Sequence, residues 1–340
     1  MKNVIWVLLL SMVFISCSKG SSTPAEVVPE NLNVTADIAT DNSGNVSFTA
    51  SATNAVTYDY DYGNGVYQTV ASGKITYKYP ASGTYTVNVT AKSSTGKSIS
   101  KSISITVNVV LRLVWSEEFD VDGSPNSGKW GYDIGTGSGG WGNNESQYYT
   151  NRTDNAVVLN GKLIITAKKE AFSGSGYTSA RLLTKDKFSF KYGKIEVSAK
   201  LPVGGGTWPA IWMLGSNINT VPWPACGEID IMEHVGNTPN KIYGTVHYPG
   251  FSGGNAVGGF TNIANVSSTF HTYTVEWSPS TINWLVDGTQ FFSFANKGNL
   301  PFNDNFFIIL NVAMGGNFGG AIDPAFTSST MEVDYVRVYQ

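Results

Sequence analysis

The chain has 340 residues, more than one ordinary domain needs, and its 41% hydrophobic and 14% charged residues exclude a disordered chain or a polyelectrolyte. The net charge of −3 gives no basic surface for nucleic acid, which excludes that class of partner. With 37 glycines and 13% aromatic residues, the composition favours an extracellular all-β protein with many turns and a broad binding face.

The N-terminus has the pattern of a secretion signal. Lys2 precedes an apolar stretch, residues 4–15, which is short for a membrane-spanning helix. The letters FISC, which end at Cys17, resemble the lipoprotein box of bacteria. This resemblance implies a lipoprotein signal peptide over residues 1–16, lipidation of the Cys17 thiol, and attachment to a membrane of the cell envelope, which we expect to be the outer membrane. The alternative is an ordinary signal peptide with an incidental cysteine.

Residues 17–30 are small and polar and include proline, which predicts a flexible tether. If Cys17 is lipidated, the other cysteine, Cys226, has no partner, and the folded part is held without a disulfide. The sequence leaves open whether the protein faces the periplasm or the outside, and we expect a monomer.

Residues 31–110 contain no Trp, Met or Cys, and apolar and polar residues alternate over 46–50, 85–90 and 103–107. This period of two, with glycine turns, predicts a small β-sandwich. The letters YDYGNG at 60–65 and SGTYTV at 82–87 resemble PKD (polycystic-kidney-disease) domains, except that Asn64 stands where Asp is usual. The resemblance implies an Ig-like sandwich that acts as a spacer or a weak binding module.

Residues 111–340 hold eight of the nine Trp and all three His, and they again have the pattern of strands. Asn160-Gly161 and Asp287-Gly288 each separate two apolar runs, which predicts two hairpins with type I′ turns. About 230 residues of antiparallel strands can bury a large core between two sheets. Further strands are predicted at 192–201, 242–248, 271–278, 305–314 and 331–339.

The segment with the most chemical information is GEIDIMEH, residues 227–234. On a strand, its two isoleucines point into the core while Glu228 and Asp230 point to the opposite face. Glu233 would share the isoleucine face of a regular strand, where an unpaired carboxylate is costly. A one-residue β-bulge near Met232 turns Glu233 to the acidic face, and such bulges occur beside active sites.

Three carboxyls crowded on one face repel one another, which separates their pKa values and retains a proton near neutral pH. A glycosidase needs one ionised carboxylate and one protonated carboxyl on either side of a sugar bond. These eight residues alone are also compatible with an ordinary solvated edge of a sheet.

The letters EIDIME resemble the catalytic strand of glycoside hydrolase family 16, in the bulged form of its laminarinase-like members. The resemblance extends in family order over residues 112–340, and all three acids of the pattern are present. Other segments that carry it lie at 113–120, 140–145, 178–181, 206–214, 244–248 and 333–338.

The resemblance implies a concave jelly-roll sandwich and a retaining mechanism. Glu228 would be the nucleophile that forms a covalent glycosyl-enzyme, and Glu233 would be the acid and then the base. Asp230, between them, would share a proton with both. The carboxyl groups of Glu228 and Glu233 would then lie about 5–5.5 Å apart.

Three tryptophans, Trp208, Trp212 and Trp223, lie just upstream of the acids. An indole offers a flat apolar face to the C–H groups of a sugar, so these residues are candidates for sugar stacking, with core packing as the alternative. Trp277 and Trp284 lie in patterned strands and are predicted to belong to the core.

The resemblance implies sugar hydrogen bonds for four polar residues that would otherwise be ordinary surface residues: Asn143, Glu145, Arg181 and His247. His247 is out of step with the apolar positions of its strand and is expected to face the cleft near Glu233, whereas His234 is expected to point away. The histidines lack the paired spacing of a catalytic zinc site. Cys226 is predicted to be a buried filler.

Family relatives hold a structural Ca²⁺, and the resemblance implies a site made of Glu118, the Gly161 carbonyl and Asp334, whose oxygens suit a hard cation. The alternative is two ordinary acidic residues near strand ends. The hydrolysis itself requires no cofactor.

These features predict a lipid-anchored retaining endo-β-glucanase that acts on laminarin-like β-1,3-glucan or on mixed-linkage β-1,3-1,4-glucan, with residues 31–110 holding residues 111–340 away from the membrane. Family members also cleave agarose, carrageenan or xyloglucan, and one sequence does not rank the loops that select among them. Two rivals are a non-catalytic glycan-binding lipoprotein, against which the complete acid set weighs, and a structural adhesin of two β-domains.

Overall fold

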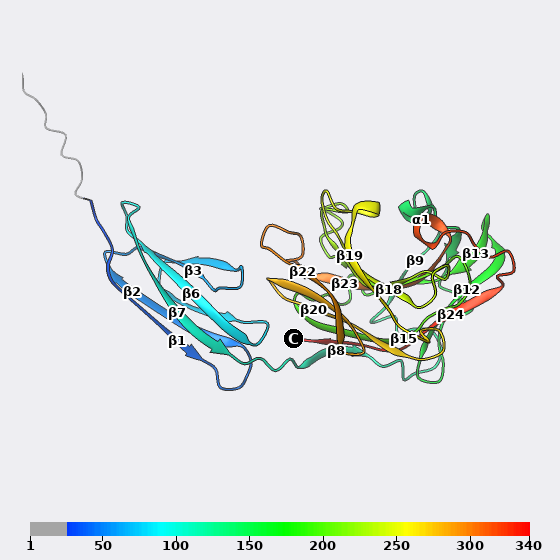
Figure 1. Ribbon diagram of the computed structural model, residues 1–340, viewed down its shortest axis with the longest axis horizontal. Coiled ribbons are helices and arrows are strands. Elements are labelled where there is room, and N and C mark those ends of the chain that lie inside the picture. The colour runs from blue at the N-terminus through cyan, green and yellow to red at the C-terminus, as the bar shows by residue number, and fades with distance from the viewer. Residues whose placement is uncertain (1–25) are drawn as a thin grey trace, which may run out of the picture.

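The computed structural model describes residues 26–340, and the predicted signal peptide and Cys17 lie outside this range. The strands form a smaller and a larger β-sandwich, which lie side by side in Figure 1. The break between them falls after Val107 and before Leu113, and the all-β prediction is confirmed. No helix in the described part of the chain is long and apolar enough to cross a bilayer.

The smaller sandwich packs a three-stranded sheet, β1-β2-β5, against a four-stranded sheet, β4-β3-β6-β7. Along β2, Val46, Phe48 and Ala50 are buried and alternate with exposed residues, as the period of two predicted. The strands are β1 (Glu30–Ile38), β2 (Asn45–Thr53), β3 (Thr57–Asp61), β4 (Tyr67–Val70), β5 (Lys74–Lys78), β6 (Gly83–Lys92) and β7 (Ser98–Val107).

Two details of the smaller sandwich concern positions that the sequence singled out, namely Asn64 and the end of the predicted tether. Asn64, which departs from the PKD pattern, is buried, and its Nδ2 donates a hydrogen bond to the Tyr77 hydroxyl at 2.9 Å. The end of the predicted tether lies against the sandwich, because Thr95 Oγ1 donates a hydrogen bond to the Val27 carbonyl at 2.7 Å. Residues 26–30 therefore belong to the folded sandwich rather than to the tether.

The larger sandwich places a ten-stranded sheet against a seven-stranded sheet, the architecture of a jelly roll. The ten-stranded sheet runs β10-β13-β12-β24-β15-β20-β21-β22, with β11 beside β12 and β8 beside β24, and the seven-stranded sheet runs β19-β18-β17-β16-β23-β14-β9.

The strands of the ten-stranded sheet are β8 (Leu113–Glu117), β10 (Gln147–Tyr149), β11 (Ala156–Val158), β12 (Leu163–Phe172), β13 (Ser175–Ser179), β15 (Gly193–Lys200), β20 (His271–Trp277), β21 (Thr281–Val286), β22 (Thr289–Ala295) and β24 (Ser328–Tyr339). Those of the seven-stranded sheet are β9 (Gly131–Asp133), β14 (Arg181–Leu183), β16 (Thr207–Gly215), β17 (Glu228–His234), β18 (Lys241–His247), β19 (Val257–Asn262) and β23 (Phe306–Met314). Short helical turns are η1 (Gly140–Asn144), η2 (Gly253–Asn255) and α1 (Gly316–Gly319).

Both predicted hairpins are confirmed. Asn160 and Gly161 have φ values of 54° and 72°, and Asp287 and Gly288 have 48° and 76°, so both central residues of each turn lie in the left-handed region. This is the conformation that a type I′ turn requires and that Asn-Gly and Asp-Gly accept at low cost. The five further strands predicted in this half of the chain correspond to β15, β18, β20, β23 and β24.

A buried tryptophan joins the two sheets below the acidic strand. Trp284 on β21 and Trp277 on β20 are buried in the core, as predicted. The Trp284 Nε1–H donates a hydrogen bond to the Asp230 carbonyl of β17 at 2.7 Å. Gly244 on β18 lies against the same indole, and a Cβ added there would be 2.4 Å from Trp284 Cδ1. Glycine is therefore required for this close approach.

Replacing Gly244 by Ala should destabilise the larger sandwich by about 1–3 kcal/mol, because the new methyl group displaces the Trp284 indole. Urea unfolding followed by tryptophan fluorescence measures the change. Gly176→Ala is the matched control, because a Cβ at this strand position meets open space. Equal stability of the two variants would contradict the tight contact.

Candidate active site

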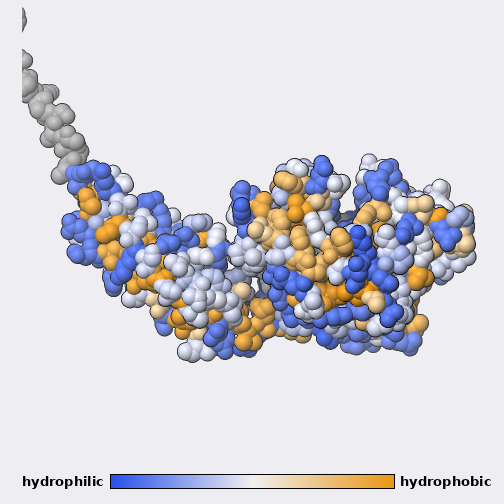
Figure 2. Space-filling view, in the orientation of Figure 1, coloured by the Kyte–Doolittle hydropathy of each residue, from blue (hydrophilic) through white to orange (hydrophobic). Residues whose placement is uncertain are grey.

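A cleft of about 740 Å³ lies on the outer face of the seven-stranded sheet. In Figure 2, apolar atoms gather beside the hollow along the upper edge of the larger sandwich. The cleft brings together every residue predicted for catalysis or sugar binding: Glu228, Asp230, Glu233, Asn143, Glu145, Arg181, Trp208, Trp212, Trp223 and His247.

The bulge in β17 is present where the sequence predicted it. Asp230 pairs with Trp212 on β16 and with Thr245 on β18. Just after Asp230, the pairing of β17 with each of these two strands shifts in register. Ile231 and Met232 are both buried in the core at this point. Because two successive residues point inwards, Glu233 returns to the cleft face and joins Glu228 and Asp230.

Burial and mutual repulsion favour protonated carboxyls in this trio. Burial, with repulsion from Asp230, raises the pKa of Glu228 to about 8. Burial, with repulsion from Glu233, places the pKa of Asp230 well above its ordinary value, and burial raises the pKa of Glu233. The trio therefore keeps protons at neutral pH, which exposed carboxyls would lose.

Two indoles and a hydroxyl group orient the glutamates. Trp223 Nε1–H donates a hydrogen bond to Glu228 Oε2 at 2.8 Å, and Trp208 Nε1–H donates one to Glu233 Oε1 at 3.0 Å. The Thr245 hydroxyl donates a longer hydrogen bond, 3.4 Å, to Glu233 Oε2. These donors favour the ionised forms, so they oppose the effect of burial and fix the directions of the carboxyl groups.

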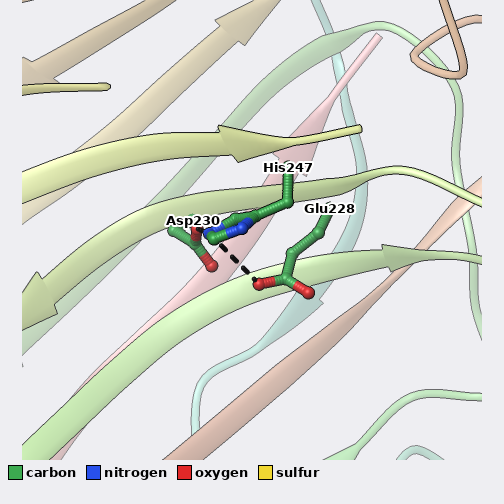
Figure 3. Close-up of side chains that lie close together, drawn as sticks. All are labelled: Glu228, Asp230 and His247. Atoms are coloured by element: carbon green, nitrogen blue, oxygen red, sulfur yellow. Dashed lines mark ion pairs between the residues drawn. The ribbon is translucent and has the colours of Figure 1, made fainter. Parts of the chain in front are cut away.

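His247 faces the cleft, but its nearest acids are not the one predicted. Its Nε2 lies 3.1 Å from Asp230 Oδ2 and 3.7 Å from Glu228 Oε1, whereas Glu233 was expected. The reason is register, because His247 on β18 pairs directly with Glu228. Figure 3 shows the ring reaching towards both carboxylates.

The tautomer of His247 determines whether Glu228, Asp230 and His247 could together bind a metal ion. One ligand-type atom each from Glu228, Asp230 and His247 lie within 4.8 Å of one another, as in a metal site. However, the Gly253 N–H donates a hydrogen bond to His247 Nδ1 at 3.2 Å, so the neutral ring has its proton on Nε2. The protonated Nε2 of His247 therefore lies on the side of the two carboxylates, which is not the arrangement of a metal ligand.

The three predicted stacking tryptophans differ in what their rings contact. Trp223 is 44% exposed, and its ring is available to a ligand. Trp212 has the Arg181 guanidinium 4.7 Å from its ring centre, and Trp208 packs edge-on against Phe318. Trp223 is thus the best of the three candidates for stacking on a sugar.

Glu145 has a structural environment that the sequence did not indicate. Gln147 Nε2 and the Tyr149 hydroxyl donate to its Oε2 at 2.6 and 3.2 Å, and Asn143 Nδ2 donates to its Oε1 at 3.3 Å. The carboxylate is therefore already occupied by donors of the protein, and it orients Asn143 in the cleft.

Sequence analysis missed several residues that line the cleft. Tyr243 shares a strand face with Thr245 and His247, and this alternation could have identified it. Phe318 lies between glycines in α1, where no periodic pattern marks it. The missed residues include Trp141, Tyr243, Phe260, Asn311 and Phe318.

Two residues beside the acids are buried away from the cleft. His234 is buried, both of its ring nitrogens lack a hydrogen-bond partner among residues 26–340, and burial lowers its pKa to about 4. Cys226 is a buried free thiol whose pKa burial raises to about 11, which matches the predicted filler rather than a nucleophile.

One carboxylate of the predicted calcium site, that of Glu118, has another partner. Both carboxylate oxygens of Glu118 accept hydrogen bonds from Arg337, Nε at 3.0 Å and Nη2 at 2.7 Å. The guanidinium neutralises the carboxylate and would repel a cation placed beside it. Asp334 is exposed on β24. The arrangement therefore does not fit the calcium site that the resemblance implied.

Comparison with known proteins gives the family. Residues 143–337 match glycosyl hydrolases family 16, and residues 27–109 match the PKD domain. The chain is 45% identical to a β-glucanase of Rhodothermus marinus, over 67% of this chain and 85% of that protein. The X-ray structure of the R. marinus laminarinase has a TM-score of 0.65 at 45% identity and covers 68% of this chain and 98% of its own. A Z. galactanivorans LamA structure with laminaritriose and laminaritetraose has a TM-score of 0.63 at 43% identity, over 67% and 98%.

The buried His234 should make the protein acid-sensitive. Its pKa is about 4 in the folded state and about 6.5 in the unfolded chain, so the unfolded state binds the extra proton between these values. Stability is therefore complete above pH 6.5 and falls as the pH drops towards 4, by roughly 2–3 kcal/mol. His234→Phe should remove this part of the loss, as measured by urea unfolding at pH 7 and 4.5. An unchanged difference between the two pH values would contradict the assignment.

Proposed function

The chain belongs to glycosyl hydrolase family 16, and on this premise we propose that its larger sandwich cleaves internal bonds of β-1,3-glucan or of mixed-linkage β-1,3-1,4-glucan. The observation that most directly supports a catalytic role is the bulged strand, which places Glu228, Asp230 and Glu233 on one face within the cleft. Buried carboxyls that keep protons at neutral pH are what acid-catalysed glycoside cleavage requires.

The proposed reaction has two displacements. In the first, the Glu228 carboxylate attacks the anomeric carbon, the bond from that carbon to the glycosidic oxygen breaks, and Glu233 gives its proton to the departing oxygen. In the second, Glu233 takes a proton from water, whose oxygen attacks the anomeric carbon and releases Glu228 as a carboxylate. Trp223 and Trp208 hold the two glutamates in place for these steps.

In this proposal, Asp230 holds a proton so that Glu228 can be ionised. Glu228 must be anionic to attack, although burial and repulsion favour its protonated form. Repulsion from Asp230 is one cause of the raised pKa of Glu228, so a proton held on Asp230 removes this repulsion and favours Glu228 as the anion. His247 lowers the pKa of Glu228 and so favours the Glu228 anion.

The substrate class rests on similarity. The R. marinus relative is named a β-glucanase, and the Z. galactanivorans relative binds laminaritriose and laminaritetraose in its structure. We therefore favour glucan over agarose, carrageenan or xyloglucan. Initial rates on laminarin, mixed-linkage glucan, agarose and xyloglucan, measured side by side, test this order. Faster hydrolysis of agarose or xyloglucan than of either glucan would overturn it.

We also propose that the protein is a lipoprotein of the cell envelope, attached to the outer membrane through Cys17. The support is the sequence alone, namely the apolar stretch 4–15 followed by FISC. Residues 18–25 would then lead from the lipid to the smaller sandwich, which acts as a spacer.

The roles of the two glutamates can be separated by azide. Glu233→Ala should lower kcat by about 10²–10⁴-fold, and azide should attack its glycosyl-enzyme to give a β-glycosyl azide. Glu228→Ala should be inactive alone, and azide should enter the space of the missing carboxylate to give an α-glycosyl azide. Glu276→Gln, which removes an exposed acid on the other sheet, is the control.

A further variant of Glu228 tests the non-catalytic alternative. Glu228→Gln should lose turnover of laminarin yet bind laminari-oligosaccharides, as followed by tryptophan fluorescence. A folded wild-type protein that binds these oligosaccharides without cleaving any of the four polymers would identify a binding protein. A protein that neither binds nor cleaves them would support the adhesin.

Lipidation predicts incorporation of labelled fatty acid into the full-length protein and recovery in the membrane fraction. Cys17→Ala should remove both the label and the membrane association, whereas Cys226→Ala should remove neither. A wild-type protein without label, recovered in the soluble fraction, would contradict the anchor.

A further inference from the structure

One wall of the cleft contains an arginine stacked between two tryptophans. The Arg181 Cζ lies 4.6 Å from the centre of the Trp141 ring and 4.7 Å from that of the Trp212 ring. On its edge, the guanidinium Nε forms an ion pair with Asp133 Oδ2 at 3.0 Å. The side chain is nearly buried, and its guanidinium lies over both indole rings.

Trp141 belongs to a loop with an unusual backbone. Between Gly139 and Asn144, five residues have positive φ values, and two of them, Trp141 at 56° and Asn144 at 57°, are not glycine. Left-handed backbone costs such residues about 1 kcal/mol each, so the loop needs support from outside. Trp141 receives it from Arg181 and from Gly137, where an added Cβ would lie 2.7 Å from the indole.

A chain of hydrogen bonds makes a second connection between this loop and Trp212. Trp212 Nε1–H donates to Asn311 Oδ1 at 2.7 Å, and Asn311 Nδ2 donates to the Tyr149 hydroxyl at 3.1 Å. That hydroxyl donates to Glu145, which also accepts from Asn143 of the loop. The loop and Trp212 are thus tied together by stacking and by hydrogen bonds.

Trp212 connects this wall to the catalytic strand. In the register of β16 and β17, Trp212 pairs with Asp230, next to the bulge that turns Glu233 towards the cleft. The backbone of Trp212 therefore adjoins the catalytic strand, while its indole contacts Arg181 and Asn311. Arg181 is the residue that contacts both tryptophans.

We propose that Arg181 is a positioning residue of the glucan cleft, which acts by stacking between Trp141 and Trp212 and so fixes the left-handed loop as a rigid cleft wall. This inference rests on the proposed function and differs from the sugar hydrogen bond that sequence resemblance implied for Arg181. The stack needs a flat cation with two faces. Lysine has the same charge but a compact ammonium group, which cannot bridge two indoles in this way.

The test is Arg181→Lys in the folded full-length protein, with Arg152→Lys as the matched control. Arg152 also has an acidic partner, Glu170, and lies 4.6 Å from the Phe172 ring, but it is outside the cleft. For laminarin hydrolysis, Arg181→Lys should raise KM about tenfold and leave kcat within about twofold. Arg152→Lys should leave both constants unchanged. A loss confined to kcat, or equal kinetics of the two variants, would overturn the proposal.

Acrylamide quenching of tryptophan fluorescence reports on the stack without any turnover. Arg181→Lys should increase quenching, because the faces of Trp141 and Trp212 become accessible, while Arg152→Lys should match the wild type. If the wild type proves inert on glucans, the proposed function fails, and increased quenching would still support the stack. Unchanged quenching would overturn the stack even in an active enzyme.

A double-mutant cycle separates this role from general stabilisation. Trp141→Leu and Arg181→Lys act on the same wall, so their combined effect on log KM should be much smaller than the sum of the single effects. Additive effects would show that the residues act independently and would overturn the proposal.

Discussion

The site depends on one irregularity, the bulge in β17. A strand without it would bury Glu233 with the isoleucines, at the cost of an unpaired carboxylate in the core. With Ile231 and Met232 both packed inwards, three carboxyls share one face, where burial and repulsion hold protons on them. The neighbouring strands then contribute what the trio needs, namely indole donors from Trp208 and from the loop at Trp223.

This concentration of buried ionisable groups affects stability in opposite directions. Because the pKa of Glu228 is raised to about 8, the folded state binds more protons than the unfolded chain above pH 4.5, and stability falls as the pH rises towards 8. Because the pKa of His234 is lowered to about 4, stability falls as the pH drops from 6.5. The two groups lie on one short strand, and the core beneath it, with Trp284 bonded to the Asp230 carbonyl, holds them in place.

Local patterns predicted the two sandwiches, both hairpins and the bulge, because alternation and turn residues act over a few positions. The polar residues of the cleft wall, Asn143, Glu145, Arg181 and His247, were implied only by the family resemblance. Cross-strand register was harder, since His247 was expected near Glu233 and instead pairs with Glu228. Contacts between distant segments were not predictable from the pattern. The Arg181 stack joins η1, β14 and β16, and the bond between Glu118 and Arg337 occupies the predicted calcium ligand. The lipid anchor at Cys17 stays a prediction.

The central claim is that the bulge brings Glu228 and Glu233 to the separation of a retaining enzyme, about 5–5.5 Å, with no room for water between them. The most direct measurement is ¹H NMR of laminari-oligosaccharide hydrolysis, which identifies the anomer formed first. The account predicts that the β-anomer appears first and then mutarotates. Initial appearance of the α-anomer would mean inversion, and so a wider separation and a different role for Glu228.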